Sequence, residues 1–218
     1  MMIDSQDLQT IVINAALRCQ MRSNILSYDP NKKPINQSRI RTYEMDDKWI
    51  VEFLKHAQVG HFATIDKDQP FINPTSFWYS SQNHELYFHS NVYGRMRHNA
   101  DKQLKASFEC FKSGKLLPSN LALEMSFQYE CVIAFGTLVV VQEVNEKKEI
   151  LNGLLKKYFG DMESGRDYRS VTKEELNQTS VYRFKIKNWS GKKNWEERAE
   201  QAEINEWPDL DPKWFDFY

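Results

Sequence analysis

The feature that most constrains the fold is a change of hydrophobic period at Gly60. Before this residue, apolar side chains recur at helical spacing behind Asp46-Asp47, namely at Trp49, Ile50, Phe53, Leu54 and Ala57. After it, apolar residues alternate with polar ones, which is typical of strands. The expected strands cover residues 61–66, 70–79, 85–91, 105–112, 129–141 and 180–188. Six strands with few helices between them predict a mainly β chain with flanking helices. An antiparallel barrel is favoured over a doubly wound α/β fold.

Three short patterns predict the helices that lie among these strands. Residues 94–103 form a basic helical segment, and Asn145 is a suitable cap for a helix that continues to Tyr158. Thr172 and Glu175 have the spacing of a capping box. Pro74 cannot donate to a strand ladder, so we expect its strand to lie at an edge of the sheet.

The two ends of the chain differ from the central part. Residues 4–16 have helical spacing, and residues 23–38 are polar and rich in asparagine and proline, as in a linker. The tail from residue 194 is acidic and then aromatic, and we expect it to pack on a core or on a second subunit. The expected division is 1–38, 39–193 and 194–218, with the barrel in the central part.

Charge and motif content exclude several classes of function. A formal net charge of -1 gives no reason to expect nucleic acid or an anionic membrane as a partner. No apolar run approaches the roughly 20 residues of a membrane span, and no secretory signal is apparent, so a cytoplasmic location is expected. The five histidines show no metal-ligand spacing, so no metal is expected. Nucleophile-elbow, phosphate-loop and dinucleotide-binding motifs are also missing.

The segment from Phe88 to Arg95 carries the chemistry that is least typical of the rest of the chain. A strand ends there in small polar residues, and a glycine and arginines then open a helix: Ser90, Asn91, Gly94, Arg95 and Arg97. Hydroxyl and amide groups, helix N–H groups and an arginine fork can together hold a phosphate. The alternative from these residues alone is a solvated basic helix face.

The preceding strand, residues 71–79, is polar and aromatic. Alternation places Asn73, Thr75, Phe77 and Tyr79 on one face. Such a strand beside a phosphate site suits a flat heteroaromatic ring that needs several hydrogen bonds. An ordinary amphipathic hairpin with core aromatic residues is the alternative.

Five sequence blocks in order resemble the pyridoxamine 5'-phosphate oxidase-like split-barrel superfamily, and within it the nitroimidazole-resistance (Nim-like) branch. They are residues 60–64, 70–77, 86–95, 129–136 and 186–192. The resemblance covers roughly residues 39–193. It implies a six-stranded antiparallel split barrel that forms a homodimer and binds FMN in a groove between subunits.

The resemblance also assigns residues to the cofactor. It places His89, Ser90 and Arg95 at the phosphate and ribityl chain, with Asn91, Gly94 and Arg97 beside them. It places the backbone of Asn73, Pro74, Thr75, Ser76 and Phe77 along the isoalloxazine, and brings Lys192 to the flavin from the last strand.

Some positions depart from the family pattern. Met96 stands where relatives usually have lysine, so Arg97 or His98 is expected to take over that contact. Cys131 replaces a frequent serine, and the arginine-rich ending of a true pyridoxamine phosphate oxidase is missing.

The resulting functional hypothesis is an FMN-dependent oxidoreductase that passes electrons from NAD(P)H to a small nitroaromatic or quinone-like acceptor. His89 is the candidate catalytic residue, as a donor or proton source, with a phosphate contact as the alternative role. Two other functions stay open: pyridoxamine 5'-phosphate oxidation itself, and a non-catalytic barrel that binds FMN or haem.

Overall fold

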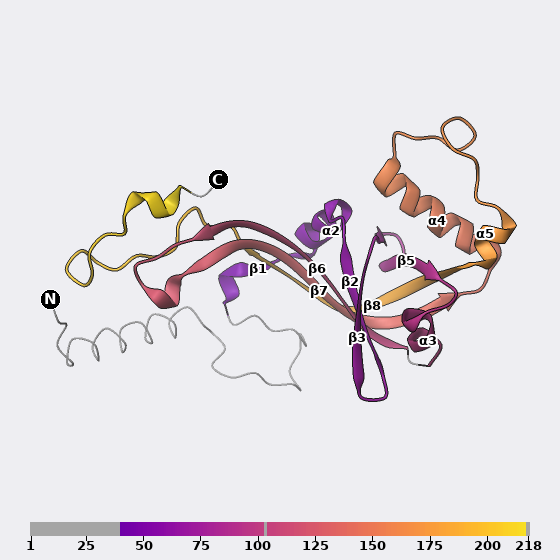
Figure 1. The fold of residues 1–218 in the computed structure, drawn as a ribbon, viewed down its shortest axis with the longest axis horizontal. Helices are drawn as coiled ribbons and strands as arrows, with labels where there is room; N and C mark the ends of the chain where they lie inside the picture. The colour runs from indigo at the N-terminus through magenta and orange to yellow at the C-terminus, as the bar shows by residue number, and fades with distance from the viewer. Residues whose placement is uncertain (1–39, 103, 217–218) are drawn as a thin grey trace. The chain divides into compact units, whose positions relative to one another are not determined.

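The computed structural model describes residues 40–102 and 104–216 (Figure 1). The helix and linker predicted within residues 1–38 therefore lie outside the described residues. Internal contacts divide the chain into two units. The barrel unit consists of residues 46–111 and 131–191, and the hairpin unit contains the described parts of residues 1–45, 112–130 and 192–218. None of the helices in the described ranges has the length and apolarity that a membrane crossing requires.

Helix α2, Asp47–His56, begins where its sequence pattern predicts. The carboxylate of Asp46 accepts a hydrogen bond from the Trp49 amide at 2.8 Å, which caps the first turn. Ile50 and Leu54 are buried one turn apart, so the predicted apolar stripe faces the core.

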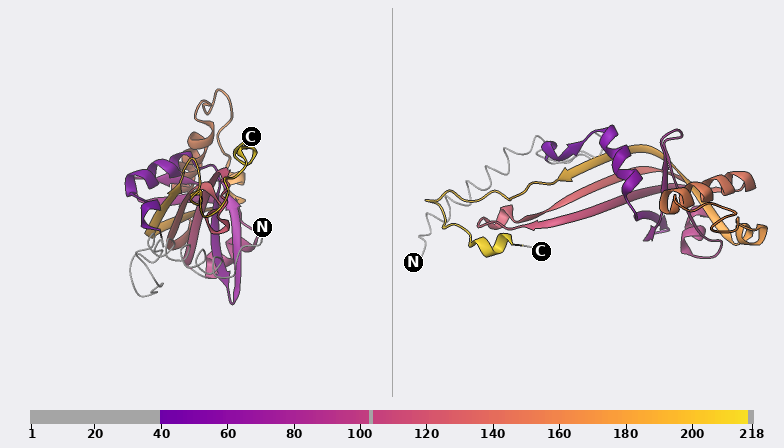
Figure 2. Two further views of the ribbon diagram at one scale, coloured as in Figure 1. Left: turned by 90° about the vertical axis from the view of Figure 1, so that its left-hand side faces the viewer. Right: turned by 90° about the horizontal axis from the view of Figure 1, so that it is seen from above.

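Eight strands form one sheet, with the order β3-β2-β6-β7-β8-β5-β4 and β1 paired to β8. Their bounds are β1 Glu44–Met45, β2 Gly60–Asp66, β3 Gln69–Thr75, β4 Trp78–Ser80, β5 Glu85–Asn91, β6 Lys105–Leu117, β7 Ser126–Val141 and β8 Thr179–Asn194. The mainly antiparallel class is confirmed, and Pro74 lies on the edge strand β3 as predicted. The expected number of six strands is too low, because β1 was not foreseen and the expected strand 70–79 is two strands. Figure 2 shows β6 and β7 running side by side.

The break in the expected strand lies at Ser76 and Phe77, and it determines the shape of the sheet. β3 is at one edge and β4 is at the other, yet only two residues separate them. Three Cα–Cα steps reach at most about 11 Å, so the two edges must come close together. A sheet whose edges approach in this way is curled into a barrel that is open along one seam, which is the split-barrel fold.

Tyr158 holds the backbone at this seam. Its hydroxyl accepts a hydrogen bond from the Phe77 amide at 3.0 Å and lies 3.1 Å from the Phe77 carbonyl oxygen. The same hydroxyl donates to the carbonyl of Gln58 at 2.6 Å. A side chain therefore partners the backbone groups of Phe77 between the two strands.

The barrel interior is filled by stacked aromatic rings. The rings of Phe62 and Phe88 stack at 3.9 Å between centroids, and Phe88 stacks on Tyr182 at 4.6 Å. A Cβ at Gly60 would overlap the ring of Phe108, so this packing requires glycine there.

Three α-helices follow in the barrel unit: α3 Arg95–Lys102, α4 Val144–Phe159 and α5 Lys173–Asn177. The capping box of Thr172 and Glu175 is confirmed. The cap predicted at Asn145 is wrong, because the carboxylate of Glu143 accepts from the Glu146 amide and begins α4 two residues earlier. Short 3-10 turns occur at η1 Arg41–Tyr43, η2 Ala122–Glu124 and η3 Pro212–Phe215.

The C-terminal tail packs on the β6–β7 hairpin within the hairpin unit. Asn120 and Gln201 exchange amide hydrogen bonds with the backbone of the tail and the hairpin, and Ala202 is buried. The expected packing is thus present, but polar contacts provide it. Trp207 and Trp214 remain 44% and 49% exposed.

Candidate functional site

The end of strand β5 positions the first group of predicted site residues. β5 pairs antiparallel with β8, so that His89 lies opposite Val181, Ser90 opposite Ser180, and Asn91 opposite Thr179. Side chains alternate along a strand, so His89 and Asn91 project from the face opposite to that of Ser90. The predicted residues are neighbours, but they do not share one face.

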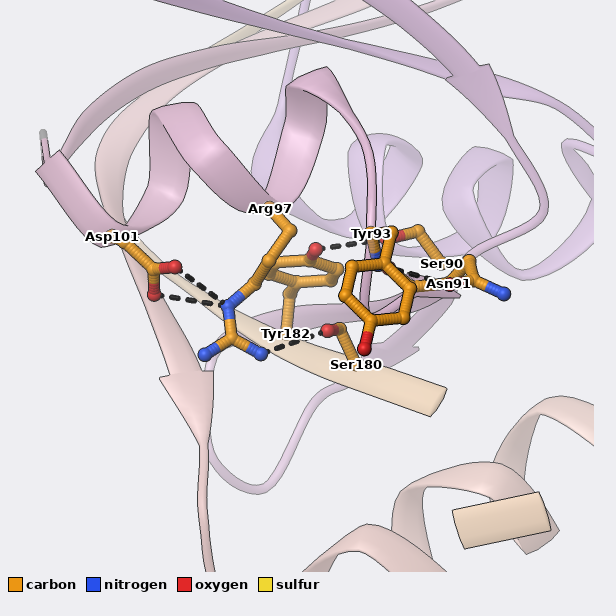
Figure 3. A network of polar contacts seen from close by, with 7 residues as sticks. All are labelled: Ser90, Asn91, Tyr93, Arg97, Asp101, Ser180 and Tyr182. Carbon is orange, nitrogen blue, oxygen red and sulfur yellow. Dashed lines mark hydrogen bonds and ion pairs between the residues drawn. The ribbon is translucent and has the colours of Figure 1, made fainter. Parts of the chain in front are cut away.

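The Ser90 hydroxyl belongs to an internal polar network that Figure 3 shows. It lies 2.8 Å from the Tyr182 hydroxyl and donates to the carbonyl of Asn91 at 2.9 Å. Since a hydroxyl has one proton, Tyr182 is then the donor to Ser90. Burial is the main cause that raises the pKa of Tyr182, so its phenol stays protonated at neutral pH. Ser90 thus fixes the strand end.

The loop between β5 and α3 is held by two hydrogen bonds. The Asn91 carboxamide oxygen accepts from the Tyr93 amide at 2.9 Å, and the Val92 amide donates to the Gln178 carbonyl at 3.2 Å. Gly94 follows with a φ of 138°, a conformation that favours glycine, and a Cβ there would meet nothing within 4 Å. The backbone therefore turns sharply and leaves open space before the first turn of α3.

The two arginines of α3 are in different electrostatic states. Arg97 donates through Nε to both carboxylate oxygens of Asp101 at 2.9 Å, and through a terminal nitrogen to Ser180 at 3.0 Å (Figure 3). The nearest acidic contact of Arg95 is Asp66 at 3.9 Å, and its side chain is 44% exposed. Of these two arginines, Arg95 is the one available to a ligand.

Asp66, at the end of β2, opposes this basic segment. Its carboxylate lies 3.2 Å from His98 and 3.6 Å from Lys102. Partial burial disfavours the charged carboxylate, but the His98 hydrogen bond and the cations of Lys102 and Arg95 outweigh this effect and lower the pKa of Asp66. The local sequence does not indicate this contact, because Asp66 is distant from α3 in the chain.

The surroundings of Met96 explain why methionine, and not the usual lysine of the family, stands at this position. Met96 is 4% exposed and belongs to the barrel core, and Asn99 is buried with its amide donating to Thr64 at 2.9 Å. This face of α3 therefore anchors the helix. The expectation that Arg97 or His98 replaces a missing lysine is weakened, since both side chains already have carboxylate partners.

The second predicted segment lies along β3. Asn73 pairs with Phe62 and Thr75 with Gly60, whereas Gln69 pairs with Asp66 at the other end of the hairpin. At about 3.3 Å per residue, Asn73 and Thr75 lie roughly 13 and 20 Å along the strand from Gln69. Helix α3 packs on β2, β3 and β5, so its cations lie at one end of this strand and Thr75 lies at the other.

The five residues of this segment have different environments. Asn73, Thr75 and Ser76 are partly exposed, Pro74 is exposed, and Phe77 is fully buried. The Phe77 side chain is thus core, and only its backbone is at the seam. The expected common face of Asn73, Thr75, Phe77 and Tyr79 is interrupted, because regular strand geometry stops at Thr75.

His89 is exposed on β5, and its imidazole has no hydrogen bond among the described residues. Partial desolvation lowers the pKa of His89, which favours the neutral imidazole near pH 7. A neutral ring offers one donor and one acceptor nitrogen.

Lys192 belongs to the hairpin unit, so its assignment to the same site stays a prediction. Within that unit the neighbouring Lys193 is paired with Glu130 at 3.1 Å. Lys192 has no ion pair or hydrogen bond among the described residues.

Two groups near the barrel wall were not found from the sequence. Lys157 is partly buried and donates to the carbonyls of Leu54 and Ala57 at 3.1 and 2.7 Å. Desolvation lowers the pKa of Lys157 to about 8. On β2 and β6, His61 lies 2.9 Å from Glu109. Neither group has a local sequence signal, because their partners come from other elements.

Two cavities, of about 490 and 350 Å³, lie between α4 and the loop that follows it. None of the predicted cofactor residues lines them. In the part of the chain that the structure describes, no three His, Cys, Asp or Glu side chains are grouped to hold a metal ion.

Comparison with protein families identifies one match over most of the chain. The model of the family described as pyridoxamine 5'-phosphate oxidase matches residues 46–193. Among curated proteins, no sequence matches this chain.

Solved structures with the same fold include three informative examples. The flavocytochrome Anf3 from Azotobacter vinelandii is 17% identical, with a TM-score of 0.69 over 82% of each chain. The FAD and heme binding protein from Mycobacterium smegmatis is 20% identical, with a TM-score of 0.64 over 72% of this chain and 75% of that chain. A proposed 5-nitroimidazole antibiotic resistance protein from Bacteroides thetaiotaomicron is 19% identical, with a TM-score of 0.56 over 68% of this chain and 85% of that chain. At these identities the similarity establishes the fold.

Proposed function

The chain belongs to the pyridoxamine 5'-phosphate oxidase family, and from this premise we propose that it is a flavoprotein that binds FMN with the phosphate at Arg95. The proposal rests on the absence, in the part of the chain that the structure describes, of a hydrogen-bond partner for the Arg95 guanidinium, at a position that follows Gly94. Its guanidinium has no hydrogen bond among the described residues and lies at the start of α3 next to open space. An arginine fork and a helix start together favour a phosphate group.

The rest of the site has dimensions that suit an elongated cofactor. The α3 cations lie at one end of the β2–β3 hairpin, and the backbone of Asn73 to Phe77 lies toward the other end. A phosphate at Arg95 would thus leave a strand length for the ribityl chain and place the flavin ring along the seam residues.

The bound flavin would supply the redox chemistry, accepting electrons from NAD(P)H and passing them to a small nitroaromatic or quinone-like acceptor. The protein would contribute His89, whose neutral imidazole can donate or accept a proton near the flavin. In the alternative role, His89 contacts only the phosphate. The rate of flavin reoxidation, measured against pH in the parent and in His89→Gln, distinguishes the two roles. If His89 donates a proton, the rate in the parent depends on the protonation of this residue, and the variant loses that pH dependence.

Binding is tested with Arg95→Ala. Loss of a charge-assisted phosphate contact should weaken FMN binding by about 1.5–3 kcal/mol, or roughly ten- to a hundredfold, as measured by fluorescence titration of the apoprotein. Lys102→Ala is the matched control, since it removes a cation from the same helix without removing the fork. Unchanged FMN affinity in Arg95→Ala would contradict the phosphate assignment, and a protein that takes up no flavin would contradict the whole proposal.

A second candidate is a barrel that binds haem as well as flavin, or in place of it, without turnover. It is favoured by the similarity to the flavocytochrome over 82% of each chain. Absorption spectra decide between them: a flavin-only protein shows no haem Soret band after reconstitution. Liquid chromatography of the released flavin identifies FMN or FAD.

Pyridoxamine 5'-phosphate oxidation is the third possibility, since the family model that matches the chain carries that description. Incubation of the purified flavoprotein with pyridoxamine 5'-phosphate separates the two functions. Oxidation of this substrate would favour the third possibility, whereas reduction of the flavin by NAD(P)H without such oxidation would favour the first.

We also infer that a second copy of the chain is the macromolecular partner. On the hairpin unit the apolar side chains of Leu116, Met125 and Phe127 are 59%, 63% and 41% exposed, whereas the polar residues Gln128 and Asn194 are buried. Apolar side chains that a unit turns outward are typical of an interface. A symmetric dimer would cover the same face on both copies.

A further inference from the structure

The larger of the two cavities described above, of about 490 Å³, lies outside the proposed flavin site. Helix α4 presents Lys148, Asn152 and Lys156 at intervals of four residues, so they share one face. The opposite face of α4 buries Ile150 and Leu154. The 160–171 segment forms the other wall. The lining residues on that segment are Gly160, Met162, Ser164, Tyr168, Ser170 and Val171.

The 160–171 segment is held in place by its own hydrogen bonds. Ser164 and Tyr168 form a parallel bridge, and the Gly165 amide donates to the Tyr168 carbonyl at 2.7 Å. The hydroxyls of Ser164 and Ser170 lie 2.8 Å apart. The wall that faces α4 is therefore organised before any ligand arrives.

The residues that line the cavity include two lysines and no carboxylate. On the 160–171 segment, Arg166 is paired with Glu163 at 3.0 Å and with Asp167 at 2.7 Å, and Arg169 is paired with Glu175 at 2.6 Å. Asp161 and Glu163 belong to this segment but do not line the cavity. The two lysines that line the cavity have no ion pair or hydrogen bond among the described residues. Two lysines beside hydroxyl and amide groups, with no carboxylate among the lining residues, suit this cavity to an anion.

The size and composition of the cavity indicate the kind of anion. A volume of about 490 Å³ is within the range of small-ligand sites. Lys148 and Lys156 are two turns apart, so their Cα atoms are separated by about 12 Å along α4. This spacing suits a ligand with phosphates at two positions. The ring of Tyr168 and the side chains of Met162 and Val171 add a surface for a flat ring.

We propose that the cleft between α4 and the 160–171 segment binds a phosphorylated nucleotide, with its phosphates on Lys148 and Lys156 and its base against Tyr168. The shared chemistry is that of a free adenine nucleotide or of the adenosine half of a pyridine dinucleotide. The site does not depend on the proposed flavin site, because no residue is common to both.

The test is calorimetric titration of the full chain with adenosine 2',5'-bisphosphate, AMP, adenosine and inorganic phosphate at low ionic strength. The bisphosphate should bind most tightly, AMP more weakly, and adenosine and phosphate at least tenfold more weakly than the bisphosphate. The double variant Lys148→Gln/Lys156→Gln should lose at least tenfold in bisphosphate affinity. Lys185→Gln/Lys187→Gln is the matched control, since it removes two exposed lysines of β8 and should bind as the parent does.

Tyr168→Leu provides a second measurement. It should weaken the nucleotides severalfold and leave inorganic phosphate unchanged, with the melting temperature confirming that the variant is folded. NADPH competing for the site would identify the dinucleotide as the source, whereas displacement by AMP alone would identify a free nucleotide. The proposal is overturned if the bisphosphate does not bind, if the lysine variant binds it normally, or if phosphate binds equally well.

Discussion

At the scale of single residues, chemically similar side chains have different roles because of their partners. Arg95 and Arg97 are two positions apart on α3, but Arg97 is paired with Asp101 and Arg95 is open. The sequence specifies that both residues are arginines. Whether each guanidinium can bind a ligand depends on which carboxylates the fold brings near it. Lys157 shows the same principle, since it is a lysine whose contacts are two carbonyls and two aromatic rings.

Lys157 should make the stability of the protein depend on alkaline pH. Its pKa is lowered from 10.5 to about 8, so between these values the unfolded chain binds more protons than the folded one. The free energy of unfolding should therefore rise with pH across this window, by less than about 1.4 kcal/mol per pH unit for one proton. Urea denaturation at several pH values should show this rise in the parent relative to Lys157→Met.

Other groups titrate in the same range, so the difference between parent and variant is the informative quantity. Lys187→Met, at an exposed position of β8, is the control for the loss of a lysine side chain. If the difference between the parent and Lys157→Met were flat from about pH 8 to 10.5, the assignment of the lowered pKa would be wrong.

At the scale of elements, the seam between β3 and β4 depends on a helix that is distant in the sequence. Phe77 lies outside the strands, where the chain passes from one sheet edge to the other. Its amide donates a hydrogen bond to the Tyr158 hydroxyl of α4, which also lies 3.1 Å from its carbonyl oxygen. One hydroxyl thus joins α4, the seam and the residue Gln58 that follows α2.

Tyr158→Phe should destabilise the protein by about 1–3 kcal/mol, because the Phe77 amide would lose its acceptor and the Gln58 carbonyl would lose its donor. Chemical denaturation measures the change. Tyr93→Phe is the control, since Tyr93 is 86% exposed and its hydroxyl has no hydrogen bond among the described residues. A Tyr158→Phe variant as stable as the parent would show that water replaces the phenol at no cost.

At the scale of the whole molecule, the hairpin unit leaves a group of large apolar side chains exposed. Leu116, Met125 and Phe127 are 59%, 63% and 41% exposed, whereas the amides of Gln128 and Asn194 are buried. Partly exposed Trp207 and Trp214 belong to the same unit. This distribution is the physical basis for the proposed homodimer.

Sedimentation velocity tests the dimer. The parent should sediment as a dimer at micromolar concentration, and Met125→Asp/Phe127→Asp should shift it toward monomer, because a carboxylate in an apolar interface is strongly unfavourable. The control Val144→Asp, at a 50% exposed position of α4, should remain dimeric. A parent that is monomeric at all concentrations would contradict the inference.

The sequence by itself determined those features that depend on neighbouring residues. Alternation predicted β2 and β5 nearly to the residue, and local capping chemistry predicted the start of α2 at Asp46 and the capping box of α5. The turn at Gly94 and the start of α3 are likewise local structures, whereas the anion site that the glycine and arginines indicate stays a prediction.

Only the tertiary structure decided the features that need partners from distant segments. Alternation continues through Ser76 and Phe77, so the break there cannot be read locally, and it exists because Tyr158 supplies the missing backbone partner. In the same way, Arg97 donates hydrogen bonds to Asp101 and Ser180. The sequence alone could not show that these contacts make Arg97 less available to a ligand than Arg95. Hydrogen bonds and ion pairs act over a few ångströms in space, whatever the separation along the chain, and that is why the fold had to be known first.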